Sequence, residues 1–358
     1  MNDEYKQLEC ISKMKQNYFE RFCAIVEEYR GKLSDNIVIE NSAFTLHDFD
    51  HHCFDIYKII SKVLFDGDLI YRQDYGLSDR ELYILNLAVL FHDIGMSNGL
   101  DRTRDNHPIH SAEYIEREYR SSKSILRKES DLSLNEIKIL KAIIIAHGTI
   151  NDMKYQKENS GIKASKLQDN EDRIGGKIRP RFLAGVLRLA DELDVSVERI
   201  GTGELEQEME ELEQKFNRLK NKQNRSEAEN KDLEKWKGFE KSLDFWRKLH
   251  LISVVKRKED DNKRILLVVD DDYVQRKLDE SQNEATITRQ LVEIYNKINK
   301  EFKEIVEVCF SGNKLGNYVP VKELIIVTEV ESIKREIDKT LDVRSLESVV
   351  EEDKKKLI

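Results

Sequence analysis

The sequence predicts a mainly α-helical protein, in which a helical bundle is followed by an antiparallel helical hairpin and a small α+β region. Only three of the 358 residues are proline, which favours long helices. Apolar residues recur at helical spacing through the first half of the chain, and segments typical of strands come only after residue 248. We therefore expect three parts, at residues 1–202, 203–247 and 248–358.

Apolar periodicity alone predicts the first two helices. One spans residues 5–29, and the next begins near Asp48. A later helix begins at Pro180, a residue suited to the first turn, and continues through the apolar segment 181–194.

Two other helices of the first half carry an explicit start signal. Ser78 with Glu81, and Ser133 with Glu136, match the capping box, in which the serine oxygen accepts a backbone N–H and the glutamate reaches back to the cap. Glycines follow where the two apolar runs stop, at positions 95 and 148. Like the helix after Pro180, both are apolar on nearly every side, so we expect all three at the centre of the bundle.

The hairpin is predicted from a heptad seam. Its apolar residues step by four, three, four and three: Leu205, Met209, Leu212, Phe216 and Leu219. Ser226 and Glu229 form a third capping box, which opens a return helix that ends near Trp246.

The last part is predicted to mix elements. Residues 251–258 and 264–272 resemble the two strands of a β-hairpin. A helix with apolar residues between Ile287 and Ile305 follows, and residues 322–330 are typical of one more strand.

Composition limits the class of protein. The net charge is −9, which argues against binding of extended nucleic acid. Four cysteines without CxxC spacing indicate a reduced, cytoplasmic protein. The N-terminal segment lacks an apolar run, so no signal peptide is expected, and the apolar runs are too short for a membrane span.

Seven of the eight histidines lie in the first part of the chain, which points to a site there. They are His47, His51, His52, His92, His107, His110 and His147. Three apolar helices each end in residues of a type that binds metal ions, namely His92-Asp93, His147 and Asp191. An unpaired imidazole or carboxylate there would cost several kcal/mol, and a bound cation would remove that penalty. Each residue taken singly could instead be a satisfied helix-end residue.

These segments resemble the HD superfamily of metal-dependent phosphohydrolases. The matching segments are TLHDFDHH (45–52), LFHDIGM (90–96), NHPIHSAEYI (106–115), IIIAHG (143–148) and RFLAGVLRLADELD (181–194). The resemblance implies a helical fold with a metal at its centre, held by His51, His92, Asp93 and Asp191. The first ligand could be His47 or His51, which are four residues apart; we prefer His51 because it lies inside the amphipathic helix, and we expect His52 to be exposed.

A second ion is an open alternative. His110 and His147 would help to hold it and Asp93 would bridge the two ions, whereas with one ion the two histidines would line the phosphate pocket. Mixed imidazole and carboxylate ligands suit manganese, iron, nickel, cobalt, zinc or magnesium.

Further roles follow from the same resemblance. His107 or His110 would act as general acid, with Asp93 counted among the catalytic residues. Arg104 and Arg188 are candidate phosphate contacts, although Arg188 could equally form a buried ion pair. His47 would cap its helix or contact substrate. Asp194 is expected to be a helix-end or ion-pair residue.

The sequence thus predicts a phosphohydrolase that cleaves a phosphate ester or anhydride, with a nucleotide or other small phosphorylated substrate. One alternative is a non-catalytic, nucleotide-sensing HD module that acts through protein–protein interaction. Another is an interaction protein that works through the hairpin. A homo-oligomer or a protein partner is expected through the hairpin or the C-terminal region.

Overall fold

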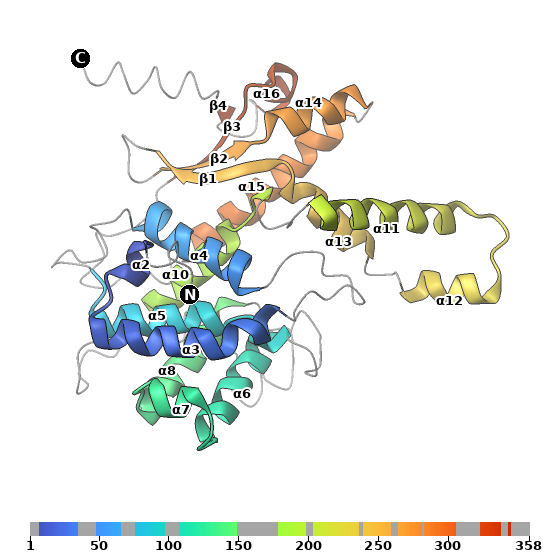
Figure 1. The fold of residues 1–358 in the computed structure, drawn as a ribbon. Helices are drawn as coiled ribbons and strands as arrows, with labels where there is room; N and C mark the ends of the chain where they lie inside the picture. Colours follow the sequence, from blue (N-terminus) through green and yellow to red (C-terminus); the bar gives the residue numbers. More distant parts are fainter. Residues whose placement is uncertain are drawn as a thin grey trace, which may run out of the picture.

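The structure is a computed structural model that describes most of the chain, and it confirms a mainly α fold with a small α+β region (Figure 1). The described residues are 7–34, 48–65, 76–96, 107–148, 178–197, 203–235, 239–258, 264–280, 283–305, 323–337 and 343–344. Among them, no helix is long and apolar enough to cross a membrane.

The predicted first helix is in fact two. α2 spans Glu9–Ser12 and α3 spans Gln16–Ser34. The chain turns between them because other elements bind the backbone of Cys10: its N–H donates to Ser61 Oγ at 3.1 Å, and its carbonyl accepts from Asn86 Nδ2 at 2.7 Å. Apolar periodicity carries no information about these tertiary contacts, so the prediction of one helix over 5–29 was wrong.

The second helical segment begins after Asp48, as predicted, but its turns are uneven. π-helical η1 (Phe49–Cys53) leads into α4 (Phe54–Lys58), and π-helical η2 (Ile59–Leu64) follows. The first turn is wide because the Cys53 N–H donates to the Asp48 carbonyl, five residues back, at 3.2 Å.

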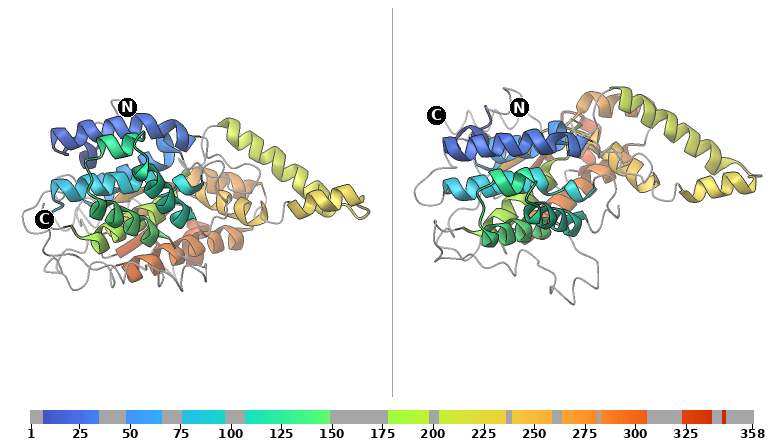
Figure 2. Two further views of the ribbon diagram at one scale, coloured as in Figure 1. Left: turned by 90° about the horizontal axis from the view of Figure 1, so that it is seen from below. Right: turned by 60° about the horizontal axis from the view of Figure 1, so that its bottom comes forward.

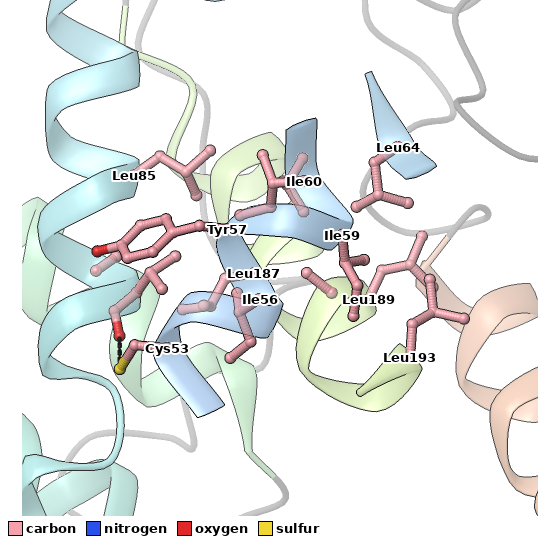
Figure 3. Packing of buried hydrophobic residues seen from close by; sticks show 14 of the residues in the cluster. Cys53, Ile56, Tyr57, Ile59, Ile60, Leu64, Leu85, Leu187, Leu189 and Leu193 are labelled. Carbon is pink, nitrogen blue, oxygen red and sulfur yellow. Dashed lines mark hydrogen bonds between the residues drawn. The ribbon is translucent and has the colours of Figure 1, made fainter. Parts of the chain in front are cut away.

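Three central helices form the core: α5 (Asp79–Phe91), α8 (Leu134–His147) and α10 (Pro180–Leu193). Both predicted capping boxes are present, and Pro180 is the first residue of α10. All described side chains of α5 from Glu81 onward are buried, which confirms its central place. Figure 3 shows Leu85 of α5 and Leu187, Leu189 and Leu193 of α10 packed around the residues of α4 and η2.

Ion pairs hold the starts of the three central helices together. Arg80 of α5 pairs with Glu136 of α8, with Nε 2.6 Å from Oε1. Arg179, which precedes α10, pairs with Glu81 of α5 over the same distance. Since both glutamates also close capping boxes, the three helices start side by side. They therefore run in the same direction, and their C-terminal ends meet.

α6 (His107–Arg120) and α7 (Ile125–Glu129) complete the bundle, and the short 3₁₀ turn η4 (Ile94–Met96) follows α5. Two glycines let α6 approach closely. A Cβ on Gly95 would lie 2.5 Å from the His107 carbonyl oxygen, and one on Gly148 would lie 2.5 Å from Pro108 Cγ. These glycines matter for packing between helices rather than for a left-handed cap.

The segment that was expected to form a hairpin contains the helices α11 (Gly203–Asn221), α12 (Glu227–Lys235) and α13 (Phe239–Leu249). Figures 1 and 2 show α11 projecting from the body and α12 lying at its far end. The third capping box is also present, since the Ser226 N–H donates to Glu229 and the Glu229 N–H donates to Ser226 Oγ. The first three side chains of the seam lie outside the described residues, and assembly through the hairpin stays a prediction.

The C-terminal part is a sheet with helices packed on it. The strands are β1 (Ile252–Arg257), β2 (Arg264–Val269), β3 (Glu323–Val327) and β4 (Val343–Arg344), in that order across the sheet. β1 and β2 are antiparallel, which confirms the predicted hairpin, and β3 is parallel to β2 and to β4.

The helices of this part are α14 (Asp271–Asp279), α15 (Glu284–Ile305) and α16 (Glu331–Ile337). Of these, only α15 was predicted. The predicted strand 264–272 ends at Val269, because Asp270 caps α14 by accepting the Tyr273 N–H at 2.9 Å. β1 packs on η2 and α15 on α10, which seats this part on the bundle (Figure 1).

Candidate metal centre

Six imidazole and carboxylate side chains converge where the three central helices end. They come from η1, the end of α5, the start of α6, the end of α8 and the last turn of α10: His52, His92, Asp93, His107, His147 and Asp191. Within each of three overlapping groups of three residues, the donor atoms lie within 4.8 Å of one another. Ligands bound to one ion at ~2.0–2.2 Å lie no more than about 4.4 Å apart, so small adjustments would bring these atoms into coordination.

Asp93 lies between two pairs of histidines. Its Oδ2 is 3.3 Å from His52 Nε2 and 3.4 Å from His92 Nε2. Its Oδ1 is 3.1 Å from His107 Nε2 and 3.9 Å from His147 Nε2. One carboxylate thus presents a separate oxygen to each pair, an arrangement that can bridge two ions.

Asp191 of α10 lies near the pair formed by His52 and His92. Its Oδ1 lies 3.3 Å from His52 Nε2 and 4.0 Å from His92 Nε2. Its side chain is 22% exposed and that of His107 is 18% exposed, whereas those of His52 and His92 are fully buried. Solvent therefore reaches the cluster on the side of Asp191 and His107.

Hydrogen bonds on the outer nitrogen orient three of the imidazoles. His52 Nδ1 lies 2.5 Å from Asp194 Oδ2, and His92 Nδ1 lies 2.8 Å from the Val89 carbonyl oxygen. His147 Nδ1 bonds the Ile144 carbonyl in the same way. Since a carbonyl or carboxylate accepts, each Nδ1 carries the proton, and each Nε2 presents its lone pair to the cluster.

The Nε2 atoms of four imidazoles form two close pairs. The two Nε2 atoms of His52 and His92 are 3.0 Å apart, and those of His107 and His147 are 3.1 Å apart. Burial lowers the pKa of His92, and burial together with the neighbouring His92 and His107 lowers that of His147 to about 3. Buried, neutral imidazoles with facing lone pairs and nearby carboxylates fit a divalent cation, which attracts all of these donors at once.

The structure corrects the choice between the two adjacent histidines. His51 turns away from the cluster, and its Nδ1 lies 2.9 Å from Asp48 Oδ2, which raises its pKa. His52, which was expected to be exposed, is fully buried among the donors. Asp48 is the N-cap of η1 and accepts the His51 N–H at 2.7 Å, so His51 folds back onto the cap.

A similar exchange occurs on α6. His107, predicted as a general acid, lies against Asp93, whereas His110, predicted as a ligand, lies one turn further along the helix. The His110 Nδ1 is 3.6 Å from Glu113 Oε2 and outside the three donor groups. The structure thus brings together His92, Asp93, His147 and Asp191 as predicted, with His52 and His107 in place of His51 and His110.

The predicted phosphate contacts have different outcomes. His47 and Arg104 lie outside the described residues. Arg188 forms an ion pair with Glu301 of α15, which is the alternative that the sequence left open for it. Its contact with phosphate stays a prediction.

Sequence reasoning missed the place of His52 and described Asp194 only in part. Asp194 was expected to be a helix-end or ion-pair residue, and it does pair with His52, but its burial behind the donors was not foreseen. His52 could have been found from the helix start, because an aspartate at the N-cap binds the residue three positions later, which here is His51. That pairing leaves His52 to face the bundle.

Comparison with known proteins gives one match. The family model described as HD-CE matches residues 42–256, which is more than half of the chain and includes all six donors. No curated protein and no solved structure matches the chain.

Proposed function

We propose that this chain, which belongs to the HD-CE family, is a metal-dependent phosphohydrolase that cleaves a phosphate ester or anhydride of a nucleotide. The observation that carries the proposal is the position of Asp93, which offers one oxygen to His52 and His92 and the other to His107 and His147. A site that only stabilised the fold would need one closed set of four ligands.

We assign the residues to two ion positions. His52, His92 and Asp93 would hold the first ion together with Asp191, which lies near both histidines, and Asp93, His107 and His147 would hold the second. Bound metals of this kind lower the pKa of water, so that hydroxide is available near neutral pH, and they stabilise negative charge on phosphate.

The chain itself supplies orientation and access. Asp194 and the carbonyls of Val89 and Ile144 fix three imidazoles with Nε2 inward. Substrate would enter beside Asp191 and His107, where the cluster meets solvent.

We assign the general acid to His110. It is three residues from His107 on α6, on the same helix face, and its side chain is 22% exposed. An imidazole that is not a ligand remains able to deliver a proton to the leaving oxygen, as general acid catalysis requires.

The substrate class follows from charge. Two arginines at α10 are committed to carboxylates, Arg179 to Glu81 and Arg188 to Glu301. The charge of a phosphate group would therefore be met mainly by the bound ions. A small phosphorylated molecule fits this arrangement better than a polyanion, which the net charge of −9 would repel.

Metal content and turnover test the proposal together. The purified full chain would be loaded with manganese, iron, zinc, cobalt, nickel or magnesium, and bound metal measured by mass spectrometry. Each loaded form would then be offered mono-, di- and triphosphate nucleotides, cyclic nucleotides and simple phosphate esters. We expect up to two ions per chain and release of phosphate or pyrophosphate from at least one substrate.

The control is the double variant His92→Ala with Asp93→Ala, whose folding is checked by circular dichroism. It should lose both metal and turnover. Full metal loading without hydrolysis of any of these substrates would contradict the enzyme and favour the non-catalytic, nucleotide-sensing alternative.

A further inference from the structure

A cavity of about 330 Å³ lies beside the metal centre rather than at it. Its walls come from α4 and η2, the end of α10, and strand β1 at the edge of the sheet. The volume is at the lower end of the ~300–1,000 Å³ typical of small-molecule sites. The cavity therefore suits a molecule larger than a single ion.

The charge around this cavity is opposite to that of the protein. Four cationic side chains line it against two carboxylates, in a chain with a net charge of −9. Lys58 is paired with Asp55, with Nζ 3.0 Å from Oδ1. Local positive charge in an acidic protein indicates an anionic ligand.

Two of the cations are available to a ligand. Lys62 of η2 and Lys256 of β1 are both exposed, and the side chain of neither forms a hydrogen bond or ion pair with any residue that the structure describes. They come from separate parts of the fold, since β1 lies against η2 only after the C-terminal sheet has docked. Two ammonium groups at one cavity suit a phosphate or diphosphate group.

The other part of the wall is apolar. Ile59 and Leu193 line it and are buried, and Figure 3 shows them close together where η2 meets α10. Val254 also lines the cavity and is 41% exposed, although it is a large apolar residue on a strand. An apolar surface next to unpaired lysines indicates a ligand that joins an anionic group to a less polar, planar or aliphatic portion.

Asp194 separates this cavity from the metal centre. The side chain lines the cavity, and its Oδ2 lies 2.5 Å from the Nδ1 of His52, on the side of the imidazole opposite to the other donors. A ligand in the cavity would thus lie behind the donors rather than among them.

We propose that this cavity is a second binding site, distinct from the metal centre, for a nucleoside phosphate. Its phosphate groups bind Lys62 and Lys256, and its base packs on Val254 and Ile59. The site needs no bound metal.

The test is equilibrium binding of ADP to the full chain in EDTA, measured by calorimetry, with adenosine and inorganic pyrophosphate as partial ligands. We expect saturable binding of ADP that is tighter than that of either partial ligand. The variant Lys62→Gln with Lys256→Gln should weaken ADP binding at least 10-fold. Both lysines are exposed, so the variant should fold normally, which circular dichroism verifies.

A matched variant, Lys128→Gln with Lys138→Gln, removes the same charge from exposed positions on α7 and α8 and should leave ADP binding within twofold. If both double variants weakened ADP binding equally, the effect would come from net charge alone, and the proposed site would be overturned. The site would also be overturned by a lack of ADP binding in EDTA, or by pyrophosphate that binds as tightly as ADP. These outcomes are independent of turnover at the metal centre, which is measured separately.

Discussion

The two ends of the three central helices use polar residues in opposite ways. At the starts of α5 and α8, Glu81 and Glu136 each close a capping box. Glu81 also pairs with Arg179, which precedes α10, and Glu136 pairs with Arg80 of α5, so these charges and backbone groups are satisfied within the protein. At the other end, the Nε2 atoms of two pairs of imidazoles face each other at 3.0 and 3.1 Å.

This difference separates stability from function along the same helices. Helix starts that satisfy one another fix the direction and register of α5, α8 and α10. Because the register is fixed at one end, the donors at the other end are held close together before any ion binds. The comparison predicts that substitutions at the first end change unfolding, and that those at the second end change metal binding.

The largest effect on stability is expected for Glu81→Ala. The side chain of Glu81 is 2% exposed and closes a capping box while pairing with Arg179. Removing it leaves the half-buried Arg179 without its carboxylate, which we expect to lower the free energy of unfolding by about 3–5 kcal/mol. Urea unfolding measures the loss, and metal content of the folded variant should be unchanged.

Glu136→Ala is the matched control, because Glu136 closes the same kind of box but is 18% exposed. We expect a smaller loss of about 0.5–2 kcal/mol. An equal loss of stability in both variants would show that the deeper burial of Glu81 does not add to its contribution.

The next effect concerns two adjacent histidines at the opposite end. His52→Ala removes a buried donor, and we expect metal affinity to fall at least about 100-fold, beyond the range for outer groups that only support a ligand. His51→Ala removes a ring that contacts only Asp48 among the interactions described for it, so its metal affinity should stay within about threefold. Competition with a fluorescent chelator measures both, and a reversed order would restore His51 as the ligand.

Asp194→Asn tests orientation rather than ligation. The carboxylate supports His52 from behind, so we expect metal affinity to fall by about 10- to 100-fold without loss of folding. Glu192→Gln changes a neighbouring carboxylate that pairs with Lys297, and it should have little effect. If both variants bind metal like the wild type, Asp194 does not position His52.

The last effect is a pH dependence that distinguishes the two ends and that builds up gradually, one histidine at a time. Burial lowers the pKa of His92 and that of His147, the latter to about 3, from ordinary values near 6.5. The folded, metal-free protein therefore binds fewer protons than the unfolded chain below pH 6.5. Its stability should be complete above that pH and should fall by up to about 1.4 kcal/mol per pH unit for each histidine as the pH decreases.

The other end responds only in stronger acid. Burial raises the pKa of Glu136, but the hydrogen bonds from Arg80 and Ser133 together outweigh burial and hold the pKa below its usual 4.5. The stability that ionised Glu136 contributes is therefore lost as the pH falls below 4.5. Urea unfolding in EDTA at pH 7, 6 and 5 measures the contribution of the histidines apart from that of Glu136. The variant His147→Gln should make the free energy of unfolding depend less steeply on pH. Constant stability from pH 7 to 5 would contradict neutral histidines in the cluster.

The sequence by itself determined the local features of this protein. Capping boxes at Ser78 and Ser133 and the proline at the start of α10 depend on a few neighbouring residues, so local chemistry was sufficient to place them. The same holds for His92, Asp93, His147 and Asp191 as a group, because polar residues at the ends of buried helices need a common explanation.

Only the tertiary structure decided between neighbours. Successive residues on a helix point about 100° apart, so a choice between His51 and His52 depends on the rotation of η1 about its axis. Its π-helical turn and the Asp48 cap set that rotation. The roles of His107, Asp194 and Arg188 depend likewise on partners at least 14 positions away, Asp93, His52 and Glu301, which a local pattern does not specify.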